Sequence, residues 1–559
     1  MYELYAALSD GTVRTDFDND IFTLQLTESE RALRGTLHAK KDAVLADLRL
    51  TAPRMYDDDD RFLANGWQTW TTTGEKRRTD RVPGIRKLQR ISKDGLHMAG
   101  ISGDYAFSGY GETGVFHAWS IAYFRKEGSR AIELWASRSE RTGFTCFEAD
   151  MARGYFRIIK EIAGQKIEAG NDYEVFDIFK TYGDYDEAMD AFFFGSLGLE
   201  KPKVHRLTGY TSWYNYFQDI DEHILLRDLN GLDRVQDQTS VFQIDDGFEP
   251  YVGDWLEPDA AKFPNGLRPI ADAVHEKGYL AGLWLAPFCA EVKSELAHTH
   301  PDWMLRDAAS GELLLTHFGW SGAYGLNLDL PEVRDYLRQV FAKVFDEWQF
   351  DLVKLDFLYS ACVQPRGGKT RGQLMCEAVD FLRELCGDKL ILGCGVPLGA
   401  CWGVFDACRI GTDASKDFAV PEPNPFQFNH EIPSARYMMQ NAVFRRFLNG
   451  RAFASDPDVF FLRDTNLSYT MDQKLLLAGL NDILGSVEFI SDNVAEYSVE
   501  ELSYLRHFFR DKHLKPGLAE FLDEDHVRMA FEEDGETHML YFDLRTGESN
   551  IWDFLPKVL

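Results

Sequence analysis

The sequence predicts a multi-domain α/β protein in which a central (β/α)8 barrel, or TIM barrel, carries a β-domain at each end. The chain has 559 residues, which is too many for a single hydrophobic core. Between residues 204 and 495, eight short apolar segments alternate with helical patterns at 334–347, 371–385 and 435–448. Strands that alternate with helices favour a parallel sheet, and eight of them are the number that closes this barrel.

Residues 1–195 are predicted to form an N-terminal β-sandwich domain. Short apolar segments such as 131–136 and 154–159 are separated by Gly and Asp turns, a pattern typical of antiparallel strands. The sequence Gly109-Tyr-Gly-Glu-Thr-Gly114 matches a dinucleotide-binding pattern, but no helical pattern follows it. We therefore interpret it as a glycine-rich hairpin between strands.

Residues 204–495 are predicted to form the barrel domain. Its expected strands are 208–216, 241–248, 280–288, 352–358, 390–398, 407–413, 451–458 and 487–492. An open doubly wound sheet is the alternative arrangement, but no phosphate-binding loop opens the segment. Residues 510–559 mix charged residues with two strand-like pieces, 527–531 and 537–542, which predicts a small C-terminal antiparallel β-domain.

The charge balance excludes several classes of partner. With 60 Lys and Arg against 90 Asp and Glu, the formal net charge is −30. Such a chain repels nucleic acid and anionic membrane surfaces, and it favours neutral or cationic small molecules. No apolar run is long enough to span a membrane, and the first residues do not have the pattern of a signal peptide.

The eight cysteines indicate the compartment. They are scattered without a Cys-x-x-Cys pair, which suits free thiols in a reducing cytoplasm better than a disulfide framework. Neither the cysteines nor the pair His298-Thr-His300 has the spacing of a metal site. We therefore expect a cytoplasmic protein with no metal and no cofactor, and a homo-oligomer is compatible with the sequence.

Two apolar segments end in a carboxylate that a cation precedes. Asp356 follows Lys354 by two residues, and Asp413 follows Arg409 by four. An aspartate at the C-terminal end of a barrel strand lies at the rim where such barrels hold their sites, and its burial is costly without cations or hydrogen bonds. A structural salt bridge is the commoner role of any single Asp. Two carboxylates from separate strands at one rim, however, are the minimum requirement for glycoside hydrolysis.

The other predicted strand ends also carry polar and aromatic residues. They are Trp213, Tyr214, Asn215, Asp245, Asp246, Trp284, Cys394, Asp456 and Asp458. Carboxylates bind paired hydroxyls, and indole rings pack on the apolar face of a pyranose. Each residue alone has a structural explanation, but their recurrence at nearly every strand end indicates a sugar-binding site.

Five motifs in order along the chain resemble the α-galactosidases of glycoside hydrolase family 36. They are Asn65-Gly-Trp67-Gln-Thr-Trp70, Ile244-Asp-Asp-Gly-Phe248, Trp284-Leu-Ala-Pro-Phe288, Lys354-Leu-Asp356-Phe357 and Arg409-Ile-Gly-Thr-Asp413. The resemblance implies a retaining enzyme that removes terminal α-linked galactose from oligosaccharides of the melibiose and raffinose type. Its partner is then a small-molecule α-galactoside. The loop after Asp413 continues Ala414-Ser-Lys416, where we expect variation in the family.

The resemblance implies that Asp356 is the nucleophile and Asp413 the acid/base. These roles require opposite protonation states. Lys354 lies on the same face of the strand as Asp356, where its charge favours the ionised nucleophile unless burial outweighs it. Burial and the charge of Asp356 would raise the pKa of Asp413, whereas Arg409 would lower it, and the sequence leaves that balance open.

The remaining site residues are implied to hold the sugar. Asp245 and Asp246 take the axial 4-hydroxyl and the 6-hydroxyl, while Lys354 and Arg409 bind ring hydroxyls. The resemblance also implies that Trp284, Cys394 and one tryptophan of the N-terminal domain, Trp67 or Trp70, line the site. Trp213 and Tyr214 are added as substrate-binding candidates because they lie at a predicted strand end.

Three other functions stay open at this point. An α-N-acetylgalactosaminidase requires a small-residue pocket beside the 2-hydroxyl, which Arg409 and Cys394 disfavour. A galactosyl-transferring enzyme would use the same carboxylates and differ only in excluding water. A non-catalytic sugar-binding or sensor protein would not need both carboxylates, so their presence argues against that class.

Overall fold

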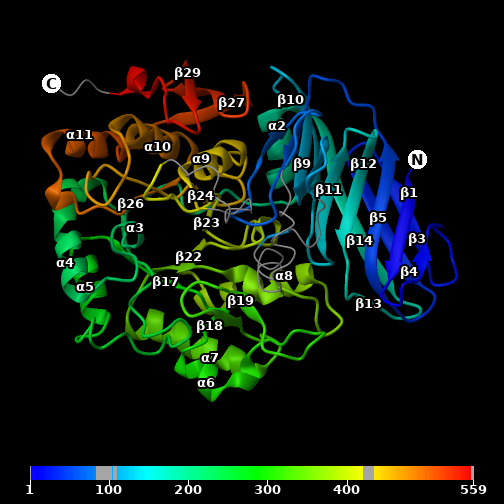
Figure 1. Cartoon of the computed structure of the whole chain (residues 1–559), viewed down its shortest axis with the longest axis horizontal. Coiled ribbons are helices and arrows are strands. Elements are labelled where there is room, and N and C mark those ends of the chain that lie inside the picture. The colour runs from blue at the N-terminus through cyan, green and yellow to red at the C-terminus, as the bar shows by residue number, and fades with distance from the viewer. Residues whose placement is uncertain (1, 83–102, 105–109, 419–432, 556–559) are drawn as a thin grey trace.

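The computed structural model describes residues 2–82, 103–104, 110–418 and 433–555, and it begins with two packed antiparallel sheets (Figure 1). The first sheet contains β2 (Val13–Arg14), β1 (Glu3–Leu8), β5 (Ala43–Pro53), β12 (Tyr155–Glu161), β11 (Phe144–Asp150) and β8 (Val115–Trp119), with β13 (Lys166–Ile167) beside β5. The second contains β3 (Phe22–Glu28), β4 (Ala32–Ala39), β14 (Asp172–Asp184), β10 (Ala131–Ser137), β9 (Ile121–Lys126), β6 (Asp60–Ala64) and β7 (Gly74–Lys76). The predicted N-terminal β-sandwich is confirmed.

Alternation of side chains explains why these strands pack face to face. In β4, every second residue from Leu33 to Ala39 is buried and the residues between them are exposed, the period of two that a strand with one covered face requires. The glycine-rich segment that matched the dinucleotide pattern begins at residue 109, outside the described residues. Gly111 and Gly114 both have positive φ and lead into the strand β8, so no helix follows them.

The barrel sheet consists of parallel strands that close on themselves. They are β15 (Leu207–Thr211), β16 (Val241–Ile244), β17 (Leu280–Leu285), β21 (Leu352–Leu355), β22 (Leu390–Gly393), β23 (Ala407–Arg409), β24 (Ala454–Asp456), β25 (Val459–Phe460) and β26 (Val487–Ile490). The segments β24 and β25 are two halves of one strand. β24 pairs with β23 and β25 pairs with β26, which in turn pairs with β15, so eight strands form a ring. The (β/α)8 barrel is confirmed, and the open sheet is wrong.

The strands end earlier than predicted. The first was expected to run to residue 216, but β15 ends at Thr211, and Trp213–Tyr216 form the short helix α3. Apolar and aromatic residues beyond the strand ends extended the sequence pattern into the loops. Those loops, and not the strands, carry most of the candidate site.

Helices cover the barrel, and most of the longer ones begin at a residue whose side chain caps the helix. Among the described residues, the helices of at least eight residues are α4 (Glu222–Gly231), α5 (Arg268–Glu276), α7 (Pro331–Ala342), α8 (Arg371–Cys386), α9 (Ala435–Phe444), α10 (Met471–Leu484) and α11 (Val499–Phe508). The shorter ones are α2 (Tyr185–Asp190), α3 and α6 (Glu295–Thr299). α8, α10 and α11 each start with a capping box, formed by Thr370, Thr470 and Ser498.

Two small sheets complete the chain. β18 (Cys289–Glu291), β20 (Ala323–Gly325) and β19 (Leu315–His317) form a three-stranded sheet in the long connection after β17. β27 (Leu514–Phe521), β28 (His526–Glu533) and β29 (Glu536–Asp543) form the predicted C-terminal antiparallel sheet, which lies over α9 and α10 in Figure 1. These sheets lie within the predicted ranges 204–495 and 510–559. The exact boundaries between the domains stay a prediction.

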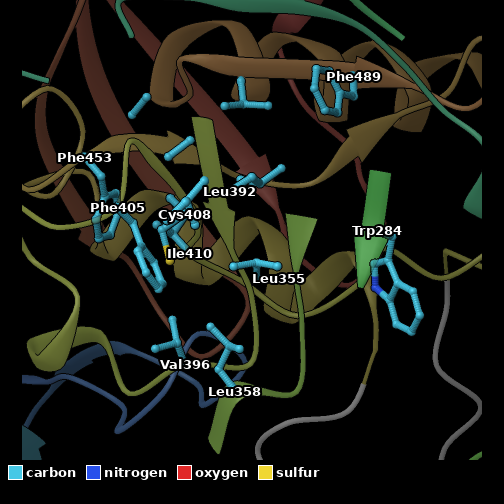
Figure 2. Close-up of a cluster of buried hydrophobic side chains, with 14 of the residues drawn as sticks. Trp284, Leu355, Leu358, Leu392, Val396, Phe405, Cys408, Ile410, Phe453 and Phe489 are labelled. Atoms are coloured by element: carbon cyan, nitrogen blue, oxygen red, sulfur yellow. The ribbon is translucent and has the colours of Figure 1, made fainter. Parts of the chain in front are cut away.

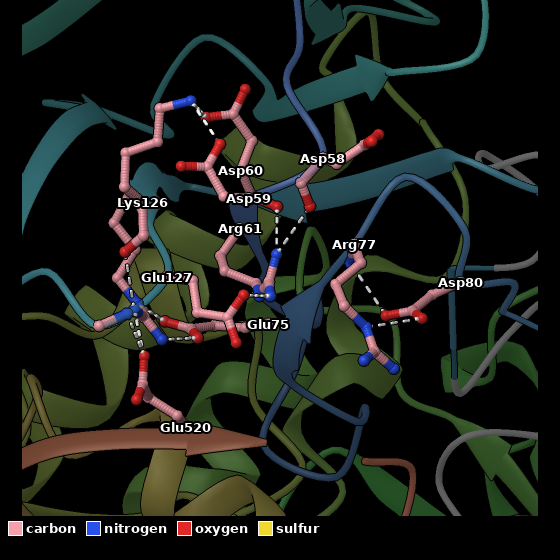
Figure 3. A network of polar contacts seen from close by, with 12 residues as sticks. Asp58, Asp59, Asp60, Arg61, Glu75, Arg77, Asp80, Lys126, Glu127 and Glu520 are labelled. Atoms are coloured by element: carbon pink, nitrogen blue, oxygen red, sulfur yellow. Dashed lines mark hydrogen bonds and ion pairs between the residues drawn. The ribbon is translucent and has the colours of Figure 1, made fainter. Parts of the chain in front are cut away.

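Buried apolar and ionic contacts join these parts. Apolar side chains from neighbouring barrel segments, among them Leu355, Leu392 and Cys408, gather into one buried cluster (Figure 2). Arg125 of β9 binds Glu75 of β7 and also Glu520 of β27, so one guanidinium links the N-terminal sandwich to the C-terminal sheet. Its two partners, Glu75 and Glu520, are labelled in Figure 3. Within the described part of the chain, we find no helix with the length and apolar character needed to cross a membrane.

Candidate active site

Asp356 lies directly after β21 and is held by hydrogen bonds with β17 and with the next residue of the chain. Its N–H donates to the carbonyl of Leu285 in β17 at 2.9 Å. One carboxylate oxygen accepts from the N–H of Phe357 at 2.8 Å, and the other accepts from the indole Nε1 of Trp284 at 3.2 Å. Phe357 has a φ of 54°, so the chain turns sharply after the carboxylate. The buried Asp356 side chain therefore has a fixed orientation.

Lys354 forms an ion pair with Asp245, and its charge also acts on Asp356. Its Nζ lies 2.9 Å from Oδ2 of Asp245. Burial raises the pKa of Asp356, Lys354 lowers it and Asp413 raises it again, so the pKa lies above the usual range for Asp. Burial thus outweighs Lys354 in the direction of this shift, which is the condition that the sequence analysis attached to the effect of the cation.

Arg409 holds two carboxylates at the end of β23. One terminal nitrogen lies 2.9 Å from Asp413, and the other lies 3.0 Å from Asp458. The side chain of Arg409 is 1% exposed, whereas that of Asp413 is 37% exposed. Asp413 is thus the more solvent-accessible of the predicted catalytic pair, a position from which it can reach a departing sugar.

Asp458 belongs to this group, although the sequence prediction placed it only at a strand end. It accepts hydrogen bonds from the hydroxyl of Tyr214 and from the N–H of Ala414, in addition to its ion pair with Arg409. Burial raises the pKa of Asp458 to about 7, while Arg409 opposes the shift. Its φ of 102° is a strained conformation for a residue other than glycine, and such strain concentrates at functional sites.

Asp245 is tightly anchored in the barrel. Its Oδ2 accepts from Gln243 at 2.7 Å, from Lys354 at 2.9 Å and from Thr211 at 3.2 Å. The other carboxylate oxygen accepts from the N–H of Asp246 at 3.0 Å. These bonds fix the orientation of Asp245 before any ligand arrives.

Asp246 is held from loops instead. Gln218 donates to one carboxylate oxygen at 3.0 Å, and the indole of Trp320 donates to the other at 2.8 Å. Glu249 is buried beside it and accepts from the N–H of Gly247 at 3.3 Å. Burial raises the pKa of Glu249 well above its usual range, and the charge of Asp246 raises it further. The shift favours the protonated form of Glu249, which could donate to Asp246.

Trp320 is a site residue that the sequence analysis missed. It lies between β19 and β20 with a φ of 56°, and its ring centroid is 6.2 Å from that of Trp284 and 5.0 Å from that of Phe357. The available signal was a tryptophan next to Gly319 in the long connection after the third strand. Because that connection belongs to no barrel strand, the pattern of polar residues at strand ends does not include it.

The structure separates the two candidate tryptophans of the N-terminal sandwich. Trp67 is 2% exposed and packs edge-on against Phe144, with the guanidinium of Arg371 4.5 Å from its ring centroid. Trp70 packs edge-on against Phe357 at 5.2 Å, beside the predicted nucleophile. Of these two, Trp70 reaches the site and Trp67 is part of the core between the sandwich and the barrel.

Cys394 and Trp213 take different positions at the rim. The N–H of Cys394 donates to Leu355 at 2.7 Å, and burial together with the charge of Asp356 raises the pKa of its thiol. Cys394 follows β22, the strand between those that carry the two predicted catalytic acids. Trp213 is half-buried and packs edge-on against Phe217, whose side chain is exposed, so it lies farther out than Cys394.

A melibiase family model matches residues 233–369, the segment that contains Asp245, Trp284 and Asp356. An α-galactosidase of Escherichia coli is 34% identical over 122 residues, which cover 21% of this chain and 16% of that protein. The matched segment is therefore a small part of this curated relative.

Solved structures extend the likeness to the whole fold. The α-galactosidase of Thermus thermophilus, in complex with p-nitrophenyl α-D-galactopyranoside, gives a TM-score of 0.69 at 23% identity and covers 92% of this chain and 98% of its own. A family 36 α-galactosidase of Geobacillus stearothermophilus gives 0.61 at 13% identity, with 97% and 81% covered. At these identities the likeness establishes a shared fold.

The barrel and its rim of carboxylates, cations and indoles resemble those of the barrel glycoside hydrolases. Within this class the chain resembles the α-galactosidases of family 36. The resemblance inferred from its five motifs is thereby confirmed.

Proposed function

We propose that this protein is a retaining exo-α-galactosidase that removes terminal α-linked galactose from oligosaccharides of the melibiose and raffinose type. The observation that carries the proposal is the placement of two carboxylates near the ends of β21 and β23, with one strand between them. The charge of Asp413 contributes to the raised pKa of Asp356, so the two carboxylates are near enough to interact electrostatically. A nucleophile and an acid on one rim are what double displacement requires.

In this mechanism Asp356 attacks the anomeric carbon and forms a covalent galactosyl ester. Asp413, when protonated, gives its proton to the leaving oxygen. The ionised Asp413 then takes a proton from water, whose oxygen attacks the anomeric carbon and releases Asp356. The fixed orientation of Asp356 supports the first step, and the greater exposure of Asp413 supports its contact with both the leaving group and water.

The sugar would be held by groups already oriented for it. Asp245 and Asp246 are proposed for the 4-hydroxyl and 6-hydroxyl, since their carboxylates are fixed by donors from the protein. Lys354 and Arg409 are proposed for the other ring hydroxyls, with Cys394 between the two acids. The indole Nε1 of Trp70 is buried and has no hydrogen-bond partner among the described residues, so it is a donor available to the sugar.

The decisive experiment compares aryl α-galactoside, α-glucoside and α-N-acetylgalactosaminide as substrates and follows the anomer released by proton NMR. The proposal expects turnover of the α-galactoside, with α-galactose appearing before β-galactose. β-Galactose appearing first would overturn the retaining mechanism. Preference for the α-N-acetylgalactosaminide would favour that alternative activity, and galactose transfer to added sugar acceptors would favour a transferring enzyme.

Trp70→Ala is expected to raise KM for aryl α-galactoside about ten-fold, because stacking of an aromatic ring contributes roughly 1 to 2 kcal/mol. The matched control is Trp67→Phe, which changes the other tryptophan of the same motif and keeps its core packing. Steady-state kinetics on both variants test this assignment. A raised KM in the Trp67 variant together with an unchanged KM in the Trp70 variant would reverse it.

Glu249→Gln is expected to leave KM at neutral pH within about two-fold, because a glutamine amide donates to Asp246 as the protonated acid does. Glu249→Ala should raise KM about ten-fold through loss of a hydrogen bond to a charged group. Michaelis constants of the two folded variants make the comparison. Equal damage in both would mean that Glu249 acts as a carboxylate.

We further propose a cytoplasmic location, from the scattered cysteines of the sequence alone. The division into domains at 1–195, 204–495 and 510–559 is proposed on the same footing.

A further inference from the structure

Arg445, at the C-terminal end of α9, contacts both segments that carry the proposed site. The first is the tryptophan loop, residues 65–73, which joins β6 to β7 and carries Trp70. The second is the end of β23, which carries Arg409 and leads to Asp413. The Arg445 side chain is completely buried.

The guanidinium of Arg445 donates mainly to backbone carbonyls of the tryptophan loop. These acceptors are the carbonyls of Gly66 at 3.3 Å, Gln68 at 3.0 Å, Thr71 at 2.8 Å and Thr69, and Nε donates to the side chain of Asn65 at 3.4 Å. A planar fork of five N–H donors can bind several carbonyls at fixed angles, which an ammonium cannot do. Arg445 thereby fixes the conformation of the loop.

The same guanidinium reaches the proposed acid/base segment. It donates to the carbonyl of Ile410 at 2.8 Å, one residue after Arg409 and three before Asp413. One face of α9 also packs on this segment, since a Cβ added at Gly411 would lie 3.4 Å from Met438 and 3.5 Å from Asn441. A shift of α9 would move the strand end and the tryptophan loop together.

Other contacts hold the tryptophan loop against the same two neighbours. Asn441 of α9 accepts from the N–H of Thr73 at 2.7 Å. On the other side, the N–H of Gly395 donates to the Thr69 hydroxyl at 2.9 Å. Gly395 has a φ of 57°, and a Cβ added there would lie 3.2 Å from the Trp70 ring. The loop is therefore packed between α9 and the segment after β22, with Arg445 at its centre.

We propose that Arg445 is a positioning residue that sets Trp70 and the Arg409–Asp413 segment in register with one another. It touches neither the sugar nor the reacting atoms, and the role rests on the function proposed above. Two effects follow from its loss. Trp70 becomes less well placed for binding, and Asp413 becomes less well placed to protonate a sugar leaving group.

The test compares Arg445→Met with Arg446→Met. Arg446 is the adjacent arginine and is also buried, but it donates to the carbonyl of Gly517 in the C-terminal sheet at 3.0 Å, and its guanidinium lies 4.5 Å from the ring centroid of Tyr185. Both variants should lose thermal stability. Only Arg445→Met should raise KM for aryl α-galactoside about ten-fold, as Trp70→Ala does. Its kcat should also fall about ten-fold more on raffinose than on the aryl substrate.

A double variant distinguishes a specific effect of Arg445 on Trp70 from a general loss of structural stability. If Arg445 acts on binding through Trp70, Trp70→Ala with Arg445→Met should have the KM of Trp70→Ala alone. Additive KM changes would overturn the proposal, as would equal kinetic changes in the Arg446 variant. If KM rises in Trp70→Ala but is unchanged in Arg445→Met, the positioning role of Arg445 is wrong and the proposed role of Trp70 stands. If KM is unchanged in Trp70→Ala, the proposed role of Trp70 is itself wrong.

Further variants keep the test decisive if Arg445→Met does not fold. Arg445→Lys keeps the charge but loses the fork, and it should show the same pattern to a smaller extent. If both fail to fold, Asn441→Ala loosens the same loop by removing the acceptor for Thr73, without deleting a charge. In that variant an unchanged KM and an unchanged substrate ratio would overturn the positioning role.

Discussion

Asp356→Gly is expected to lower turnover of every α-galactoside by about 10⁴-fold or more, whatever the leaving group, because no covalent intermediate can form. Removing the side chain also vacates space on the side from which it attacks. Azide should therefore restore some turnover of activated substrates, and direct displacement by azide should give β-galactosyl azide. Rates with and without azide, together with NMR of the product, measure both effects.

A control for this variant lies at the other end of the same strand. Asp351 precedes β21, and its carboxylate is 2.7 Å from His275 and 3.1 Å from Lys389. Asp351→Asn should leave kcat unchanged at permissive temperature, since it alters an ion pair at the opposite end of the strand. Substantial hydrolysis by Asp356→Gly without azide would remove this residue from the nucleophile role.

Asp413→Ala is expected to separate substrates by leaving group. Raffinose and melibiose have sugar leaving groups that need a proton, so galactosylation by these substrates should fall by about 10²- to 10³-fold. Nitrophenol leaves with little assistance, so the same step with its galactoside should fall far less. Pre-steady-state kinetics on both substrate types distinguish the two cases.

Azide gives the second signature of the Asp413 variant. Here it attacks the covalent intermediate, so it should speed breakdown of that intermediate and give α-galactosyl azide. The opposite pairing of azide products in the two variants would mean that the roles of Asp356 and Asp413 are exchanged. Equal losses on all substrates, with no azide rescue in either variant, would exclude double displacement.

The barrel and several rim residues were predictable because each strand is a short apolar run followed by a polar residue. Asp245, Asp356 and Arg409 were found in this way, since their positions depend only on where a strand ends. The pairing of Lys354 with Asp245 was not predictable, because it depends on the distance between neighbouring strands. Burial, which raises the pKa of Asp356, likewise depends on packing around the whole rim.

The residues that were missed depend on contacts between distant parts of the chain. Trp320 lies 74 residues from the carboxylate to which it donates, and Arg445 lies 379 residues from Gly66. Neither lies at the end of a barrel strand, and a single sequence carries no signal for such pairings. Trp67 and Trp70 occupy one motif, and only their packing against Arg371 or Phe357 tells them apart.

The interruption between β24 and β25 has a consequence for the redesign of specificity. Asp458 lies at this interruption, where one half-strand pairs with β23 and the other with β26, and the same side chain binds Arg409. Substitutions at Asp458 would therefore alter ring closure together with the sugar contact proposed for Arg409, so gains in selectivity would be coupled to losses of stability. Trp320 belongs to a loop outside the barrel ring, and it is the better starting point for a library of variants that accept other sugars.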